Sequence, residues 1–454
     1  MQLERIKYIL RKEDLPYIVI LFICLISRLF SSIAYYEDPE ALQFSLIALE
    51  SNFDVLQSSA PVVCFAVKIL DYLLNNIGLN FSVLGGFSTG VVIIYSLKLL
   101  RVPPLSLEGG LVAFMVFFNP LLWIMSNSYA PYMAGAVLAI AALFYTIENY
   151  YNQGSLNKGF FLIGLLAGVV LQYTLIPLVP GLYYVIKRKQ WKPLLFLGLG
   201  VAVWLAPSLL VDAASFPQFI HSQLRFFYSE HQFGILTLLK VLWATGMGGY
   251  WMGREYFLVI TMLPLFSFLF FGLLVIMGFG NEKEKIYLYS ALLLLYLLFT
   301  LFQSAQYYTG LLLPIIPLLA ITAAYGVIYF LINFNMLQVK LVIFIYMVIT
   351  VYFAVGTAIE HVQPTSLAQL ADYLANDEYS EKGLNVLCAN DTITTYLKKG
   401  VGANFYPAAD SSAKLTGKLV SVNDSLHRSY TNSVTFQHDL FINPYCTKIK
   451  LYEY

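Results

Sequence analysis

Long apolar segments separated by short polar stretches fill about the first 360 residues of the chain. A helix that spans a membrane needs about 20 apolar residues, and about eleven segments approach or meet that length. The predicted spans are 15–34, 81–100, 107–125, 131–149, 159–173, 175–187, 193–210, 256–278, 286–302, 309–331 and 340–358. The fifth and sixth are short, and we expect a tight hairpin that turns at Gln172, Tyr173 and Thr174. The pattern predicts a polytopic α-helical membrane protein.

Two segments between predicted spans are too long to be simple turns, namely 35–80 and 211–255. The first contains a stretch at 61–74 with a helical period, apolar on most faces and interrupted by Lys68 and Asp71. Such a stretch is typical of a helix that lies in the membrane interface rather than across the membrane. We therefore expect two large loops on one side of the membrane.

The distribution of Lys and Arg predicts which side that is. Cytoplasmic loops carry an excess of Lys and Arg. If the N-terminus is cytoplasmic, its side holds most of these residues, and the opposite short loops hold Lys68, Arg225, Lys240 and Arg254. An odd number of spans then places the C-terminus outside. We predict a multi-pass protein of the inner (plasma) membrane with both large loops on the extracytoplasmic face.

The composition changes after about residue 360, where Asn, Asp, Ser, Thr and Lys become common. Apolar runs shrink to strand length at 384–388, 418–422 and 448–454, and a short helix is expected after the first of them, through Leu397. The chain is therefore predicted to consist of a transmembrane domain at 1–358 and a soluble extracytoplasmic α/β domain at 359–454. Whether Cys388 and Cys446 form a disulfide in that domain stays open.

The composition agrees with a membrane protein. Hydrophobic residues make up 59% of the 454 residues and charged residues 12%, with a mean hydropathy of +0.70. A soluble domain has about 25% charged residues. The net charge of +1 gives no electrostatic reason to expect a nucleic-acid partner. The four cysteines include no CxxC pair, so the sequence has no recognisable zinc or redox motif.

Three carboxylates, Glu37, Asp38 and Glu40, follow the first predicted span. Asp38 and Glu40 flank Pro39, which is typical of a helix start that needs an N-cap and an acid near the dipole. Capping explains Asp38 and Glu40, and an exposed surface position would explain Glu37. A cluster of acids at head-group level is also the place for a catalytic base, with Asp38 the first choice because Pro39 fixes its position.

The layout resembles the GT-C glycosyltransferase superfamily, in particular the branch of bacterial protein O-mannosyltransferases and the lipid A aminoarabinose transferase. The resemblance is carried by Arg28 and Leu29 before the acidic cluster, by the span at 81–90, by the hairpin at 171–177 and by the 307–317 stretch, where Tyr307 precedes a Leu-Leu-Pro-x-x-Pro pattern. It covers about 15–358 and, more loosely, the C-terminal domain. In one respect the sequence departs from this family, because Gln172 stands where many relatives have Lys.

The resemblance implies an inverting glycosyltransferase that moves a sugar from a polyprenyl-phosphate donor to a protein, lipid or polysaccharide acceptor. A carboxylate would accept the proton of the acceptor hydroxyl, and cations or amide donors would bind the departing phosphate. Arg28, Gln172 and Tyr307 are candidates for the phosphate site because of the resemblance. No cofactor is certain, and a requirement for a divalent metal stays open.

The second large loop supplies the other candidates for the phosphate site, which are His221, Arg225, His231 and Arg254. His221 and Arg225 are four residues apart and would share one helix face. Each residue has an ordinary alternative: Arg225 could pair with an acid, His231 could be solvated, and both Arg28 and Arg254 could extend to the interface as anchors.

Three alternatives remain open, and one of them is a structural or inactive subunit, because the motifs match the family imperfectly. A lipid or glycan transporter would have inverted repeats and helices broken at the midplane, whereas here the polar residues cluster at the outer face. A polyprenyl-diphosphate glycan ligase or polymerase would bind a more highly charged donor. Gln172 and the small number of cations favour the monophosphate donor.

Overall fold

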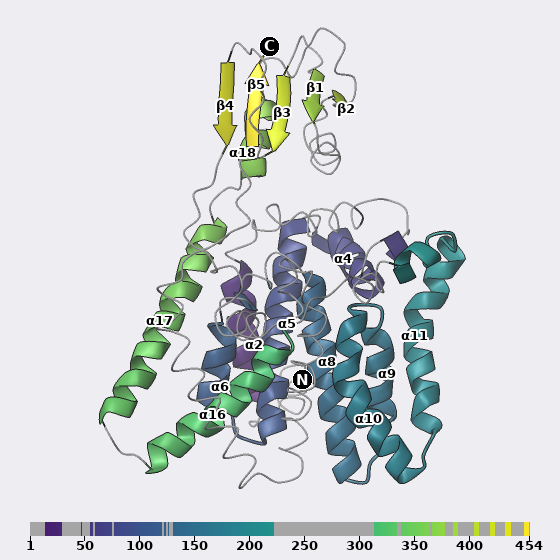
Figure 1. Ribbon diagram of the computed structural model, residues 1–454, viewed down its shortest axis with the longest axis vertical. Coiled ribbons are helices and arrows are strands. Elements are labelled where there is room, and N and C mark those ends of the chain that lie inside the picture. The colour runs from purple at the N-terminus through teal and green to yellow at the C-terminus, as the bar shows by residue number, and fades with distance from the viewer. Residues whose placement is uncertain are drawn as a thin grey trace, which may run out of the picture.

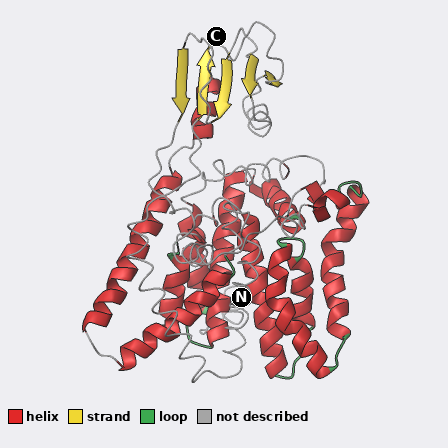
Figure 2. Cartoon of the chain, viewed as in Figure 1, coloured by secondary structure: helices red, strands yellow, loops and turns green. Residues whose placement is uncertain are grey.

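A computed structural model of the chain has a helical body with a smaller part, built around a β-sheet, at one end (Figures 1 and 2). The structure describes residues 14–29, 47, 55–57, 60–74, 77–119, 122–123, 126, 130–221, 313–333, 337–362, 366–376, 385–388, 404–407, 418–422, 432–436 and 449–453. The α-helices with defined bounds are α2 (Leu15–Leu29), α4 (Pro61–Leu74), α5 (Ile77–Leu100), α6 (Leu107–Phe117), α8 (Ala130–Tyr151), α9 (Asn157–Leu166), α10 (Leu175–Arg188), α11 (Lys192–Val211), α16 (Ile315–Asn333), α17 (Leu337–Val362) and α18 (Ser366–Asn376).

The predicted spans at 256–278 and 286–302 lie outside the described residues, and each of the others overlaps a described helix. The span predicted at 159–173 is too long, because α9 ends at Leu166. Within the described part of the chain, three helices are long and apolar enough to cross a membrane: Leu79–Leu100, Pro131–Tyr151 and Lys192–Val211. The hairpin prediction is confirmed, because α9 and α10 are joined through a 3₁₀ turn, η3 (Leu171–Thr174). The helix predicted at 61–74 is α4, with the same bounds.

The predicted span at 107–125 is wrong in its extent, because α6 ends at Phe117. Asn119 follows and accepts a hydrogen bond from the backbone N–H of Leu122 through its side chain (3.1 Å). Pro120 comes next, and an Asn-Pro pair favours a turn over a continuing helix. Later in the chain, α17 continues past the predicted domain boundary of 358 to Val362.

Glycines let two pairs of helices approach closely. On α5, Gly86 and Gly90 face α2, and a Cβ at Gly86 would lie 2.8 Å from the Cα of Leu25. On α9 and α11, Gly164 and Gly200 face each other, and a Cβ at Gly200 would lie 2.2 Å from the carbonyl oxygen of Phe161. Small residues at such crossings allow backbone-to-backbone packing, which stabilises helix pairs in lipid.

The C-terminal part is a five-stranded mixed sheet with the order β2-β1-β3-β5-β4. Its strands are β1 (Asn385–Cys388), β2 (Asn404–Pro407), β3 (Lys418–Val422), β4 (Asn432–Phe436) and β5 (Ile449–Glu453). Strand β1 pairs in parallel with β2 and β3, whereas β5 pairs antiparallel with β3 and β4. Helix α18 packs on the sheet through buried Leu residues and through Tyr373, whose ring lies 5.4 Å from that of Phe436.

The predicted strands at 384–388, 418–422 and 448–454 are confirmed as β1, β3 and β5, and β2 and β4 were missed. The missed strands are the two edges of the sheet. Edge strands bury less apolar surface, so their sequences carry a weaker hydrophobic pattern. β2 ends in Pro407, and β4 has exposed polar residues at Asn432, Ser433 and Thr435.

The two ends of the helical body differ in charge. We call the end next to the sheet the sheet end and the opposite one the basic end (Figure 1). Helix ends and turns at the basic end carry Lys98, Arg101, Lys158, Lys187, Arg188, Lys189, Lys192 and Lys340. Helix α4 lies at the sheet end, with Pro61, Val63 and Val67 buried and Ile69 and Tyr72 exposed.

Candidate functional site

Arg28, in the last turn of α2, is completely buried. Its Nε donates a hydrogen bond to the hydroxyl of Ser126 (3.0 Å), its Nη1 to the hydroxyl of Ser27 (3.0 Å) and its Nη2 to the carbonyl oxygen of Phe117 (3.4 Å). Burial of a guanidinium is costly unless its donors are paired. These bonds therefore fix the end of α2 against the segment that follows α6.

Aromatic rings complete the surroundings of Arg28. Its guanidinium carbon lies 3.6 Å from the ring centroid of Trp123 and 4.9 Å from that of Phe117. The two rings contact each other edge to face at 5.3 Å. A cation over an aromatic face is stabilised by the negative face of the ring, most strongly where water is excluded. The rings therefore compensate part of the cost of burying Arg28.

Close packing against α5 makes this arrangement sterically specific. A Cβ at Gly85 would lie 1.5 Å from the carbonyl oxygen of Ser126, and one at Gly86 would lie 3.3 Å from the Cβ of Arg28. Any side chain at Gly85 would displace the segment that carries the Ser126 hydroxyl. We call Arg28, Phe117, Trp123 and Ser126 the Arg28 cluster.

Gln172 lies in η3 and is half-buried. The next residue, Tyr173, is fully buried and packs against α8, where a Cβ at Gly135 would lie 2.8 Å from its ring. Helix α4 is tied to the same hairpin, because the N–H of Val62 donates to the carbonyl oxygen of Gly168 (3.0 Å). These contacts place Gln172 in a turn that is attached to α4.

The start of the second large loop is attached to the same region through Phe219. Its ring lies 5.7 Å from that of Trp204 on α11, and both residues cluster with Leu56 of the 3₁₀ turn η2 (Val55–Gln57). Trp204 is fixed by a hydrogen bond from its Nε1 to the carbonyl oxygen of Gly164 (3.1 Å). His221 follows Phe219 by two residues and is exposed to solvent.

The predicted site residues divide into two groups. Arg28, Gln172 and His221 are described, and they lie on three separate segments: α2, η3 and the short helical stretch after α11. The predicted candidates outside the described residues are Glu37, Asp38, Glu40, Arg225, His231, Arg254 and Tyr307. Among the described residues, no group of three or more His, Cys, Asp or Glu side chains could hold a metal ion.

Sequence reasoning missed the partners of Arg28, which are Phe117, Trp123 and Ser126. The Asn-Pro pair at 119–120 was the available indication that the chain turns there and could return to α2. It also missed the hydrogen bond from the Asn80 side-chain amide of α5 to the Asp71 carboxylate of α4 (3.0 Å). This bond explains how the Asp71 carboxylate is accommodated within a mostly apolar helix.

Comparison with known proteins gives similarity at the level of structure. No family model and no curated protein matches the sequence. The solved structure of ArnT from Cupriavidus metallidurans bound to undecaprenyl phosphate superimposes with a TM-score of 0.59 and 12% identity, over 96% of this chain and 97% of that one. The apo structure of the same protein gives a TM-score of 0.55, with the same identity and coverage.

ArnT is the lipid A aminoarabinose transferase, which is the branch of the GT-C superfamily indicated by the sequence. At 12% identity, the similarity establishes the fold and not the chemistry. Together with the apolar helices, it identifies an integral membrane protein. The chain shares the fold of ArnT over nearly its whole length, as the sequence resemblance predicted.

Proposed function

We propose that this protein is an inverting glycosyltransferase that transfers a sugar from a polyprenyl-phosphate donor to an acceptor at the extracytoplasmic face of the membrane. The observation that carries the proposal is the fold it shares, over 96% of its length, with a protein solved with undecaprenyl phosphate bound. The acidic cluster and the second large loop supply the residue types that this chemistry needs.

The reaction is a single displacement at the anomeric carbon. The acceptor hydroxyl attacks that carbon, the bond from the carbon to the phosphate oxygen breaks, and its electron pair leaves with the phosphate. A carboxylate takes the hydroxyl proton. We assign this role to the group of Glu37, Asp38 and Glu40, with Asp38 as the first choice. Attack from the face opposite the phosphate inverts the configuration.

Cations and amide donors must stabilise the phosphate as it leaves. We assign this role to His221, Arg225, His231 and Arg254 of the second loop. Gln172 and Tyr307 complete the set as neutral hydrogen-bond donors. The attachment of Phe219 to Trp204 and Leu56 supports the assignment, because it fixes the start of the second loop beside the first one.

For Arg28, the contacts support a positioning role rather than direct contact with phosphate. Its side chain is fully buried and hydrogen-bonded to Ser126 and Phe117. It lies in the last turn of α2, nine residues before Glu37 in the chain. A fixed helix end determines where the segment that carries the acids begins, and the positioning of reacting groups contributes strongly to catalysis.

The acidic residues provide the test. The purified protein is assayed for transfer from a polyprenyl-phosphate sugar, with Asp38→Asn, Glu37→Gln and Glu40→Gln compared singly with the wild type. Because Asn still caps a helix but accepts a proton poorly, we expect Asp38→Asn to lower transfer by roughly 10²–10⁴ while folding is kept. Glu108→Gln, on α6 at the basic end, is the matched control and should keep full activity. Full activity in all three acid variants would disprove the assignment.

A further inference from the structure

A surface cavity of about 450 Å³ lies at the basic end, between the turn that joins α8 to α9 and the turn that joins α10 to α11. It is far from the Arg28 cluster in the fold, because both turns are at the end opposite the sheet (Figure 1). The residues that matter for its chemistry are Gln153, Gly154, Asn157, Gln190, Trp191 and Lys192. The proposed transfer reaction uses none of them.

Arg188 holds the two turns together. Its Nη1 donates to the carbonyl oxygen of Gly154 (2.8 Å), and its Nη2 donates to the carbonyl oxygens of Asn149 (3.3 Å) and Tyr150. The guanidinium carbon also lies 4.7 Å from the centroid of the Tyr150 ring, which stacks on Tyr184 at 3.8 Å. The cavity wall therefore exists before any ligand binds, which lowers the entropic cost of binding.

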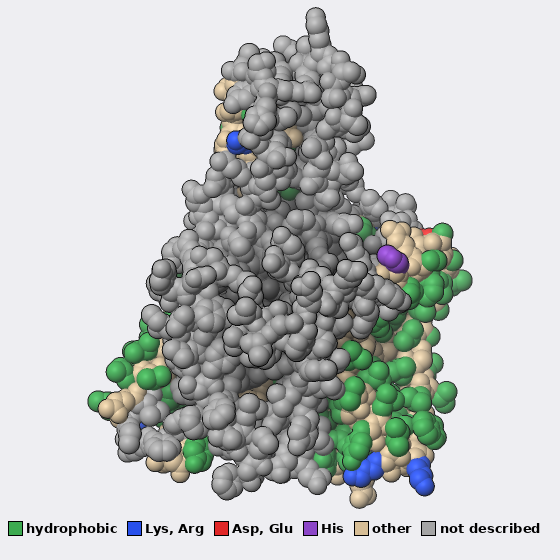
Figure 3. All heavy atoms as spheres, viewed as in Figure 1, with side chains coloured by type: hydrophobic (Ala, Val, Ile, Leu, Met, Phe, Trp, Pro, Cys, Tyr) green, Lys and Arg blue, Asp and Glu red, His purple; other side chains and the backbone are tan. Residues whose placement is uncertain are grey.

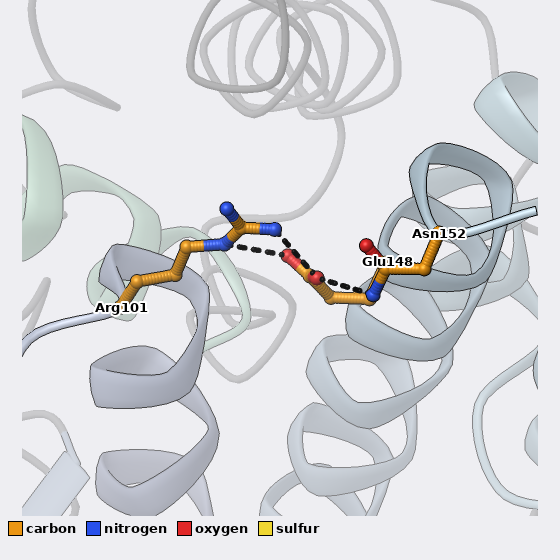
Figure 4. Close-up of polar contacts among 3 residues, drawn as sticks. All are labelled: Arg101, Glu148 and Asn152. Carbon is orange, nitrogen blue, oxygen red and sulfur yellow. Dashed lines mark hydrogen bonds and ion pairs between the residues drawn. The ribbon is translucent and has the colours of Figure 1, made fainter.

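Lys189 and Lys192, near Arg188 in the chain, take no part in these contacts between the two turns. Among the residues that the structure describes, neither Lys189 nor Lys192 forms an ion pair or a hydrogen bond through its side chain, and both are exposed. The nearby acid on α8, Glu148, is already engaged by Arg101 and Asn152 (Figure 4). Of the residues that line the cavity, Lys192 is the charged one and none is acidic, so the lining is positively charged.

Backbone groups add to this charge. Helices α9 and α11 both begin at the cavity, and neither has a side-chain hydrogen bond at its N-cap, Leu156 or Trp191. The positive ends of the two helix dipoles favour an anion at the cavity. In the first turns, the N–H of Asn157 donates to the hydroxyl of Ser155 (3.3 Å) and that of Leu194 to the carbonyl oxygen of Trp191 (3.0 Å). The helix dipoles therefore add to the positive potential that the lysines create at the cavity.

An apolar surface continues from the cavity along the membrane-facing side. On α10, Tyr183 and Ile186 are exposed, and on α11, Leu195, Leu199 and Val203 are exposed, with fractions from 54% to 70%. Figure 3 shows hydrophobic side chains over this flank and basic ones at its end. Trp191, 61% exposed, lies where the two surfaces meet, as interfacial tryptophans do.

We propose that this cavity binds the headgroup of an anionic phospholipid, whose acyl chains lie along the exposed faces of α10 and α11. The charge of the cavity selects an anionic headgroup, and the adjoining apolar flank selects a molecule with acyl chains over a soluble anion. Basic sites between helices at the cytoplasmic side are a known mode of binding such lipids. The site does not depend on the transferase chemistry.

The test measures binding of phosphatidylglycerol and phosphatidylcholine to the full-length protein by native mass spectrometry. The double variant Lys189→Gln/Lys192→Gln removes the charge of Lys192, which lines the cavity, and that of Lys189, which directly precedes the lining residue Gln190. The control Lys98→Gln/Lys340→Gln removes two at the same end on α5 and α17. Because each cation contributes about fivefold to anionic lipid binding, we expect the cavity variant to bind phosphatidylglycerol roughly twentyfold more weakly and the control to stay within about twofold.

Three outcomes would overturn the proposal. An equal loss in the control variant would show diffuse attraction to the basic end and no site. Equal binding of phosphatidylcholine would show that charge does not select the lipid. Competition by free glycerol phosphate at the concentration of the lipid would show an anion site without acyl-chain contacts. Trp191→Ala, which leaves all charges in place, should also weaken binding of phosphatidylglycerol, and unchanged binding would exclude the cavity.

Discussion

Arg28 and Arg101 lie at opposite ends of two helices that pack together, and they have opposite surroundings. Helices α2 and α5 run antiparallel, since Gly86 faces Leu25 and Arg28 whereas Gly90 faces Leu21. Arg28 ends α2 towards the sheet end and is completely buried. Arg101 directly follows α5 at the basic end, where its side chain is 56% exposed and lies 2.9 Å from the carboxylate of Glu148 (Figure 4).

The chemical nature of the partners also differs between the two arginines. Arg28 is held by hydroxyl groups, a carbonyl oxygen and two aromatic rings. Arg101 forms a two-point ion pair with one carboxylate, through Nε at 3.3 Å and Nη2 at 2.9 Å. A buried cation must have its partners in fixed positions, whereas an exposed pair competes with water and salt. Arg28 is thus held by packing and fixed neutral partners, and Arg101 by charge.

The largest effect is expected in a test of which end faces which compartment. In a background without native cysteines, Ser433→Cys on β4 and Ser155→Cys in the α8–α9 turn are exposed to an impermeant maleimide in sealed, right-side-out vesicles. Because Lys and Arg concentrate at the basic end, that end should be cytoplasmic. We expect complete labelling of Ser433→Cys and none of Ser155→Cys until the vesicles are opened. The reverse pattern would show that the predicted orientation is wrong.

The next effect concerns Arg28. Arg28→Ala removes three hydrogen bonds and two ring contacts, so we expect a loss on the order of 2 kcal/mol or more in the free energy of unfolding. Transfer should fall by about 10²-fold, because the segment after α2 is no longer fixed. Steady-state kinetics separates the roles: a lower kcat with an unchanged KM for the donor indicates positioning.

A raised KM for the donor with an unchanged kcat would instead support direct phosphate contact by Arg28. Arg28→Lys keeps the charge but loses the planar fork, so it should restore only part of the activity. Ser126→Ala is the milder companion variant. It removes a hydroxyl that accepts one hydrogen bond from Arg28 and donates another to the carbonyl oxygen of Trp123 (2.8 Å), and it should cost about 1–2 kcal/mol.

The smallest effect is expected at Arg101. Exposed ion pairs contribute about 0–1 kcal/mol, so Arg101→Ala should change the free energy of unfolding by less than about 1 kcal/mol and leave transfer unchanged. A double-mutant cycle with Glu148→Gln measures the pair directly, and its coupling energy should decrease at high salt. A coupling energy as large as the effect of Arg28→Ala would show that the exposed pair stabilises the fold as much as the buried arginine does, which contradicts the comparison.

Local pattern was enough to determine much of the architecture. The helix predicted at 175–187 is α10, and the strand predicted at 418–422 is β3 with the same bounds. Apolar length, turn residues and the distribution of Lys and Arg are properties of neighbouring residues, so they can be read along the chain. The predicted layout follows from the same order of spans and loops, and the fold shared with ArnT agrees with it.

The roles of individual polar residues were decided only by the tertiary structure. The sequence predicted either a phosphate ligand or an interfacial anchor at Arg28. In the structure its Nε donates to the hydroxyl of Ser126, which is 98 residues away in the chain. The close approach of Gly164 to Gly200 and the cavity beside Lys192 likewise join segments that are far apart in sequence. Such contacts depend on how whole helices pack against one another, which hydrophobic period alone does not specify.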